Sequence, residues 1–335
     1  MDIEVRAVDP DDDETLHART AILAAARARD VPDFPPVCPV REVGQLRHPS
    51  RAADLVSWLA YLDGQPVGVL TEWLPLRENL GNVRLELVVD PAYRRRRVGT
   101  ALYAFAVADA PKRGRIRIIS DAVGQLPGGA PRDGGGNAFA EAMGAKPALD
   151  DVRRRLDVST VDIDALEPLP LPGYTPVYWR DRAPEEHLAD IGRLDGRLVL
   201  DAPSGDLVIE PPKVDAERIR DEELSSAHCG ERRYHTGIRH DASGALVAWT
   251  TLAFEATVPD HAWQQITIVD PDHRGHRLGL RVKLANLRYA LGHEPALRVI
   301  DTWNAAANVH MIAINEAIGY RAVDVWCQWQ HELSQ

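Results

Sequence analysis

The stretches Val89–Gly99, VDPAYRRRRVG, and Val269–Gly279, VDPDHRGHRLG, decide the fold, because they are two copies of one signal. Both begin with Val-Asp-Pro, and both place Arg, Arg and Gly at matched positions. The offset between the copies is 180 residues (270 minus 90). A repeat at this spacing indicates a repeated structural unit, which has to be recognised before any other feature is interpreted.

The sequence around each copy repeats as well. Each has a β-branched, apolar run before it, a helical pattern after it, and then a second strand-like run. Each half then carries a short helix that ends in glycine, at Gly144 and Gly319, where a helix C-cap needs a positive φ. An earlier hairpin turns at Asp63-Gly64 in the first half and near Ser243-Gly244 in the second.

These patterns predict an α+β protein made of two tandem domains, each a mostly antiparallel central sheet flanked by helices. We expect the first domain to cover residues 1–165 and the second to cover residues 177–335. Between them, residues 166–176 are rich in proline and predict a linker.

The composition excludes several classes of function. The 335 residues carry a net charge of −11, which argues against nucleic-acid binding. No apolar run reaches the roughly 18 residues of a membrane helix, and the acidic N-terminus does not resemble a signal peptide. Three scattered cysteines favour a reducing cytoplasm, and the spacing of the histidines and cysteines predicts no metal site.

The repeated loop has the chemistry of an anion site. Gly99 and Gly279 lie where a helix begins, so backbone N–H groups without intrahelical partners point outward. These donors, the positive end of the helix dipole and nearby arginines favour phosphate. We therefore expect the arginines of both loops to serve a pyrophosphate.

The loop resembles motif A of the GCN5-related N-acetyltransferases, Arg/Gln-x-x-Gly-x-Gly/Ala, whose backbone amides bind the pyrophosphate of acetyl-CoA. The chain departs from the motif at its first glycine, which is Arg97 in one half and Arg277 in the other. The resemblance covers both halves and implies a tandem acetyltransferase similar in layout to mycothiol synthase, with acetyl-CoA or another acyl-CoA as donor. It implies these cofactor-binding residues: Val269, Arg274, Gly275, His276, Arg277, Leu278, Gly279, Leu280, Asn304, Asn308, Arg94, Arg97 and Gly99.

A second family marker distinguishes the halves. The resemblance implies an asparagine that contacts the pantetheine arm, seven residues before a helix position that is often a tyrosine. In the second half these positions are Asn308 and Asn315, whereas the first half has Asp133 and Ala140. We therefore expect catalysis in the second half, which leaves the first half to bind cofactor without turnover or to act as scaffold.

The resemblance implies direct attack of a primary amine on the thioester. In the second half the candidate bases are Glu255, Asp301 and His310, and Asn315 stands where the family often has its acid. Three tryptophans are expected near the acceptor: Trp249, Trp263 and Trp303. In the first half, Glu86 lies on the central strand, where some family members place their base, and this keeps the opposite assignment open.

The sequence therefore predicts an N-acetyltransferase that acts on a small-molecule amine in the cytoplasm, as a monomer or a homodimer, without nucleic-acid or membrane partners. Two alternatives stay open. One is a catalytically silent acyl-CoA-binding sensor or scaffold, because the tyrosine is absent from both halves. The other is an enzyme that acetylates a protein or peptide amine.

Overall fold

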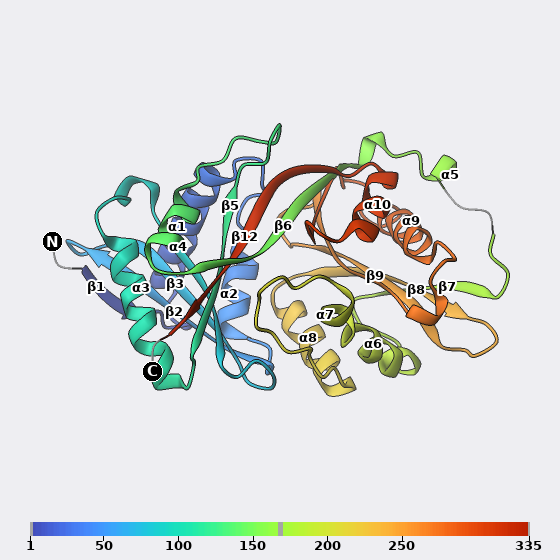
Figure 1. Ribbon diagram of the computed structural model, residues 1–335, viewed down its shortest axis with the longest axis horizontal. Helices are drawn as coiled ribbons and strands as arrows, with labels where there is room; N and C mark the ends of the chain where they lie inside the picture. The colour runs from blue at the N-terminus through green and yellow to red at the C-terminus, as the bar shows by residue number, and fades with distance from the viewer. Residues whose placement is uncertain (1–2, 167–169, 334–335) are drawn as a thin grey trace. The chain divides into compact units, whose positions relative to one another are not determined.

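The computed structural model describes residues 3–166 and 170–333, and the chain divides into two compact units. The first unit holds Met1–Asp151, Gly205–Ile209 and Asp324–Gln335, and the second holds Val152–Ser204 and Glu210–Val323. Both units combine helices with a sheet, which confirms the predicted α+β class (Figure 1). The division differs from the boundaries expected from the sequence, because the units also receive segments from outside their own half of the chain.

The first unit carries the first copy of the repeat. Its strands have the order β1-β2-β3-β4-β5-β12. The elements are β1 Ile3–Ala7, α1 Asp13–Asp30, α2 Pro39–Arg47, β2 Ala53–Leu62, β3 Gln65–Pro75, β4 Asn82–Val89, α3 Val98–Asp109, β5 Arg117–Gly124, α4 Gly135–Ala142 and most of β12 Arg321–Glu332.

The second unit repeats this plan with the strand order β6-β11-β10-β9-β8-β7. The elements are the second part of β6 Lys146–Asp157, then α5 Ile163–Leu166, β7 Tyr174–Arg180, α6 Leu188–Asp195, α7 Leu198–Asp201, α8 Ala216–His228, β8 Arg232–His240, β9 Leu246–Phe254, β10 His261–Val269, α9 Leu278–Leu291, β11 Val299–Ala305 and α10 Val309–Ile318. Within the expected linker 166–176, residues 167–169 lie outside the described residues, and β7 already begins at Tyr174.

The last strand of the chain completes the first unit. Residues Val325–Glu332 of β12 pair antiparallel with Gly124–Arg117 of β5. The second unit in turn contains Val152–Asp157, the C-terminal part of β6, next to β11. Neither unit is therefore a continuous piece of sequence.

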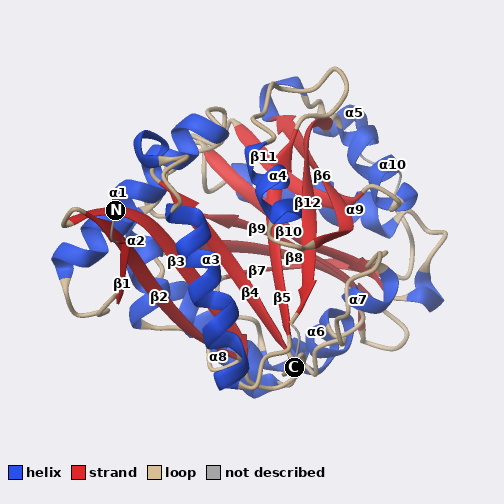
Figure 2. Cartoon of the chain, turned by 60° about the vertical axis from the view of Figure 1, so that its left-hand side comes forward, coloured by secondary structure: helices blue, strands red, loops and turns tan. Residues whose placement is uncertain are grey.

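Helices cover both faces of each sheet. Successive residues of a strand point to opposite faces, and both sets include apolar side chains. In the first unit Leu70 packs in the core that contains α3, whereas the neighbouring Val69 packs in the core that contains α1 and α2. Figure 2 shows α3 lying along the strands of this sheet. In the second unit α9 takes the place of α3, while α6 and α8 cover the opposite face.

The two parallel strands at the centre of each sheet separate part of the way along. β4 and β5 pair from Asn82↔Arg117 to Leu85↔Ser120, and both continue beyond these pairs. β10 and β11 pair only up to Trp263↔Asp301. Backbone groups beyond these points are free of this pairing, so each sheet opens toward its repeated loop.

The central strand of the second unit also bulges. The register between β10 and β9 shifts between Gln264 and Thr267, whereas β4 pairs with β3 without a shift. Gln264 fills the bulge, because its Nε2 donates to the backbone oxygen of Thr251 at 2.8 Å and to Thr250 Oγ1 at 3.0 Å. Bulges of this kind redirect backbone groups beside active sites.

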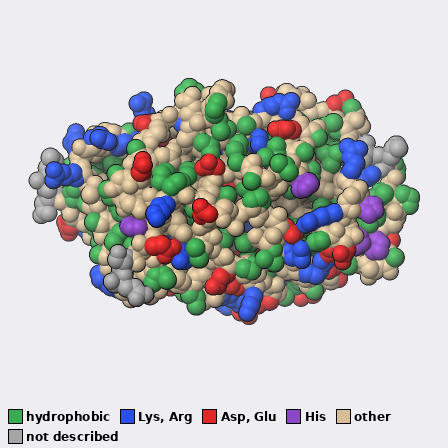
Figure 3. Space-filling model, viewed as in Figure 1, with side chains coloured by type: hydrophobic (Ala, Val, Ile, Leu, Met, Phe, Trp, Pro, Cys, Tyr) green, Lys and Arg blue, Asp and Glu red, His purple; other side chains and the backbone are tan. Residues whose placement is uncertain are grey.

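The hairpins and helix ends predicted from the sequence are present. Asp63 and Gly64 have φ values of 51° and 79°, and Gly244 has a φ of 73°. Gly144 and Gly319 have φ values of 85° and 118°, as helix C-caps require. On the face seen in Figure 3, acidic and basic side chains are interspersed among apolar ones. In the described part of the chain, no helix has the length and hydropathy to cross a membrane.

Candidate functional site

The two repeated loops share an unusual backbone. Arg95 and Arg97 in the first unit have φ values of 62° and 67°, and the matched Gly275 and Arg277 have φ values of 85° and 56°. Alternating left-handed residues turn successive N–H groups into one concavity, which is an anion-binding arrangement. Arg97 and Arg277 therefore keep the left-handed conformation that glycine gives the family motif, at a cost of about 1–2 kcal/mol each.

The helix that follows each loop begins without a side-chain cap. Neither Arg97 nor Arg277, the N-cap residues of α3 and α9, makes a capping hydrogen bond. The first-turn amides are thus available to an external anion, together with the positive end of the helix dipole. The backbone of both loops therefore has the geometry of an anion site, and its use by a pyrophosphate stays a prediction.

The first arginine of each motif pairs with an acidic residue at the end of a preceding helix. Arg94 forms two 2.7 Å hydrogen bonds to the carboxylate of Asp30, and its Nε donates to the backbone oxygen of Val89. Arg274 pairs with Asp201 at 3.0 Å. Both arginines tie the loop to a preceding helix. Arg97 and Arg277 are exposed at the helix starts.

The motif glycines and the residues beside them shape the helix starts. A Cβ on Gly279 would lie 2.9 Å from Ile314 Cδ1 of α10, and one on Gly99 would lie 3.4 Å from Phe139 of α4. Leu278 and Leu280 are buried core residues, so only their backbone can contact a ligand. Val269 packs against the same core.

Aromatic and histidine rings gather at the loop of the second unit. Tyr174 Oη and His273 Nδ1 are 2.9 Å apart, and the ring of His276 lies 5.4 Å from that of Tyr174. The ring of His240 lies 4.8 Å from that of His273, at an angle of 56°. Sequence reasoning missed Tyr174 and His240 because they come from β7 and β8, far from the loop along the chain.

A buried polar chain links α9, α10 and β11. Lys283 Nζ donates to Asn315 Oδ1 at 2.7 Å, and Asn315 Nδ2 donates to Asn304 Oδ1 at 2.6 Å. Burial lowers the pKa of Lys283 to about 7. Asn315 is fully buried with both ends of its amide engaged, so it does not face a leaving group. Asn308 caps α10 by accepting from the backbone N–H of Met311.

Lys283 was not among the residues predicted from the sequence. A signal was present, because Lys283 stands one turn after Gly279 on the mostly apolar face that α9 buries. A lysine at such a position is ordinarily extended to the surface, and only the packing of α10 shows that this one is buried.

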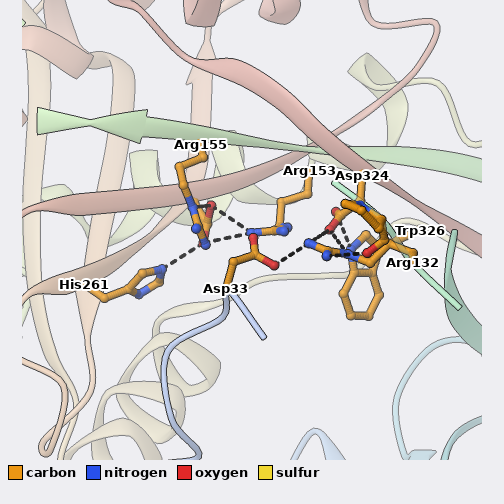
Figure 4. A network of polar contacts seen from close by, with 9 residues as sticks. Asp33, Arg132, Arg153, Arg155, His261, Asp324 and Trp326 are labelled. Atoms are coloured by element: carbon orange, nitrogen blue, oxygen red, sulfur yellow. Dashed lines mark hydrogen bonds and ion pairs between the residues drawn. The ribbon is translucent and has the colours of Figure 1, made fainter. Parts of the chain in front are cut away.

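Asp301 is the centre of a second buried network. Its carboxylate accepts from His261 Nε2 at 3.0 Å, from Arg155 at 2.7 and 2.9 Å, and from Arg153 at 3.3 Å. Although burial opposes ionisation, these hydrogen bonds and charges lower the pKa of Asp301 to about 2. Figure 4 shows His261, Arg155 and Arg153 converging. A carboxylate held this way is a poor base, so the structure argues against the catalytic role that the sequence suggested.

Glu255 lies beside two of the three expected tryptophans. Its Oε1 accepts from Trp263 Nε1 at 3.1 Å, and the ring of Trp263 lies 5.5 Å from that of Trp303. Glu255 is buried, whereas His310 is exposed on α10. Trp249 belongs instead to the core under α6, where it stacks on His235.

Glu86 in the first unit faces a cluster under α1. The strand β4 holds it one residue beyond the last pair with β5, and its side chain is 40% exposed. Burial and the neighbouring Glu42 raise its pKa, although Arg19 lies 3.9 Å away. Arg19 itself is buried and hydrogen-bonded to Glu42 at 2.8 Å.

The loop between α1 and α2 is anchored in the same unit. Arg132 pairs with Asp33 of this loop and, at 2.8 Å, with Asp324 at the start of the first unit's part of β12 (Figure 4). Phe34 stacks on Trp326, with ring centroids 5.5 Å apart. No group of three or more His, Cys, Asp or Glu residues able to hold a metal ion occurs among residues 3–166 and 170–333.

Known proteins share this architecture. The family model described as "Acetyltransferase (GNAT) family" matches residues 23–125. A solved tandem GNAT protein from the clavulanic acid biosynthesis pathway is 34% identical, with a TM-score of 0.89, and the match covers 100% of this chain and 99% of that one.

Two more distant structures share the fold. A GCN5-related N-acetyltransferase from Sphaerobacter thermophilus is 14% identical over 99% of this chain and 96% of that one, with a TM-score of 0.66. A putative acetyltransferase from Pyrococcus horikoshii is 14% identical over 99% and 90%, with a TM-score of 0.55. A search of curated proteins found no match. With both motif loops in place and full-length similarity to a tandem relative, the chain belongs to the GNAT acetyltransferase family.

Proposed function

We propose that the protein transfers an acyl group from acetyl-CoA, or from another acyl-CoA, to a primary amine of a small molecule by direct attack in the second unit. The choice of the second unit rests on the geometry of its central strand β10. This strand bulges between Gln264 and Thr267, and it separates from β11 after the pair Trp263↔Asp301. Its unpaired backbone is suited to hold an extended pantetheine arm and to offer an N–H to the oxygen on which charge develops.

The donor fits the loop that precedes α9. The concavity formed by Gly275 and Arg277 presents backbone amides to a pyrophosphate, and the exposed Arg277 side chain adds a positive charge. The acceptor amine attacks the thioester carbon, so a C–N bond forms, the C–S bond breaks, and CoA leaves as the thiolate, which takes up a proton from water.

Glu255 is the base that we propose for this step. It accepts a hydrogen bond from Trp263, whose ring lies 5.5 Å from that of Trp303, and the two rings would shield the attacking amine from water. The carboxylate takes the proton that the amine loses as the C–N bond forms. This arrangement also favours an acceptor that carries positive charge.

The second candidate places the reaction in the first unit. The observation that favours it is Glu86, which lies on the separated part of β4 with a raised pKa and a half-exposed side chain. Its loop has the same backbone as that of the second unit. The family model also matches this half of the chain.

Matched charge reversals test the assignment. Arg277→Glu and Arg97→Glu place a carboxylate at the same position of the two loops, and both residues are exposed N-caps. Arg277→Glu should weaken acetyl-CoA binding to one site by about tenfold or more in calorimetry, as expected for a lost charge-assisted hydrogen bond, and should reduce turnover. Arg97→Glu should leave turnover with an amine panel close to that of the wild type.

The bases are compared in the same assay. Glu255→Gln should lower kcat by about a hundredfold or more and leave acetyl-CoA affinity unchanged, whereas Glu86→Gln should have little effect. The reverse result would place the reaction in the first unit. Acetyl-CoA binding without thiol release from any amine or peptide would identify a sensor, and release only with peptides would identify a protein acceptor.

A further inference from the structure

The second unit contains a row of hydrogen-bonded side chains that the proposed reaction does not use. It consists of Lys283, Asn315 and Asn304. The chain begins inside the core, where the Lys283 ammonium group also lies 4.9 Å from the centre of the Tyr320 ring. It ends on β11, three residues beyond Asp301, where that strand has already separated from β10. Because Asn304 is hydrogen-bonded to the buried Asn315, the buried residues can set the orientation of the Asn304 amide at the open part of the sheet.

The order of donors and acceptors along this chain is fixed. A lysine amine has no acceptor role when protonated, so Lys283 can hold only the oxygen of the Asn315 amide. The nitrogen of Asn315 is then the end that faces Asn304, which must present its own oxygen. The amide of Asn304 is thereby fixed with Nδ2 at its free end. Among the described residues, Asn304 Nδ2 has no hydrogen-bond partner in the structure.

The asparagine expected to contact the pantetheine arm is used elsewhere. Asn308 caps α10 through the backbone N–H of Met311 at 3.2 Å. Asn304 lies at the separated end of β11, where the arm would run if the second unit binds acyl-CoA. Its free end is a hydrogen-bond donor, which suits an amide carbonyl of the pantetheine arm.

We propose that Lys283 is a positioning residue, which acts through Asn315 to direct Asn304 Nδ2 toward a carbonyl oxygen of the pantetheine arm. This proposal rests on the proposed function, because it requires acyl-CoA in the second unit. The lowered pKa of Lys283 is compatible with the role, since both the ammonium and the amine can donate to Asn315.

The first unit provides an internal comparison. The position of Lys283 is occupied there by Tyr103, whose hydroxyl lies 2.7 Å from His331 Nδ1, and the position of Asn315 is Ala140. The chain of amides is therefore absent from that copy. The hydrogen-bonded side chains Lys283, Asn315 and Asn304 are therefore specific to the second unit.

The test compares two substitutions at position 283. Lys283→Gln keeps a donor that can reach Asn315, whereas Lys283→Met has a similar length and no donor. Both are made in the Arg97→Glu background, so that calorimetry reports mainly the second unit. Lys283→Met should weaken CoA binding about fivefold, as expected for one hydrogen bond, and Lys283→Gln should stay within about twofold of its parent.

Two further readouts separate positioning from a merely structural effect. Adenosine 3′,5′-bisphosphate lacks the pantetheine arm, so Lys283→Met should leave its affinity unchanged. In an Asn304→Ala background, Lys283→Met should have no further effect on CoA binding. Equal losses for both ligands, or an undiminished loss in the Asn304→Ala background, would overturn the proposal.

Folding and the proposed function are controlled separately. If Lys283→Met fails to fold, Asn315→Leu removes the middle of the chain and is compared with Asn304→Ala in the same way. If Arg277→Glu leaves binding of both CoA and the bisphosphate intact, the site itself has been misplaced and the proposed function fails. A loss confined to CoA in Lys283→Met supports the positioning role.

Discussion

Glu72 gives the sharpest test of the physical reasoning in the first unit. It lies on β3 with no exposed surface, and neither carboxylate oxygen has a hydrogen-bond partner among the described residues. Its strand neighbours Leu70 and Leu74 belong to the apolar core under α3. Burial, assisted by the negative charge of Asp109 and opposed by Arg113, raises the pKa of Glu72 from 4.5 to about 7.

The expected cost follows from this pKa. The change from 4.5 to about 7 corresponds to about 3 kcal/mol, because one pKa unit is worth about 1.4 kcal/mol. The folded pKa lies above the unfolded one, so the unfolded state releases its proton first as the pH rises. The destabilisation that the buried Glu72 carboxyl causes is therefore absent below about pH 4.5, grows between pH 4.5 and 7, and is complete above pH 7.

Glu72→Gln removes the ionisable group and keeps its shape. At pH 8.5 it should stabilise the first unit by about 3 kcal/mol, which raises Tm by roughly 6–12 °C for a unit of this size. Near pH 5 the gain should fall to less than about 1 kcal/mol. Scanning calorimetry of both proteins over this pH range measures the difference.

The second unit supplies a reciprocal control, because Leu252 occupies the position that matches Glu72 in the repeat. Leu252→Glu should introduce a penalty with the same pH dependence into the transition of the second unit. A gain from Glu72→Gln that is equal at pH 5 and pH 8.5 would refute the reasoning, since the effect would then come from packing and not from ionisation.

Three other perturbations have defined outcomes. Asp301→Asn should cost the second unit about 3–5 kcal/mol in denaturant unfolding, because it removes the negative charge that the fully buried Arg153 contacts at 3.3 Å. Ending the chain after Val323 should abolish the thermal transition of the first unit, because it removes the strand that pairs with β5, while the transition of the second unit persists. Gly319→Ala and Gly144→Ala should each destabilise their unit by at least about 1 kcal/mol in thermal melts, because alanine is strained at a φ of 118° or 85°, and unchanged melting temperatures would contradict this.

Much of the fold could be read from local patterns. The matched strand–loop–helix segments predicted two equivalent loops, and the structure shows left-handed residues at the same two positions of each. Gly144 and Gly319 were predicted as helix caps because a positive φ at a helix end is a local requirement. Such features depend on a few neighbouring residues, so the sequence alone carries them.

The roles of charged side chains were harder to predict. Arg94 and Arg274 were expected at the pyrophosphate and instead bind Asp30 and Asp201. Asp301 was a candidate base until packing placed His261 beside it. Each of these partners lies tens of residues away along the chain, where spacing arguments have no information.

The sequence by itself determined that this protein is a tandem repeat with two matched strand–loop–helix segments, because helix starts, turns and caps are set by local conformational preferences. Only the tertiary structure decided which strand completes which unit and which polar groups are buried together. Lys283 shows the reason. Its pKa is lowered by burial, and its orientation is set by the hydrogen bond to Asn315 of α10, which lies beside it only when the chain is folded.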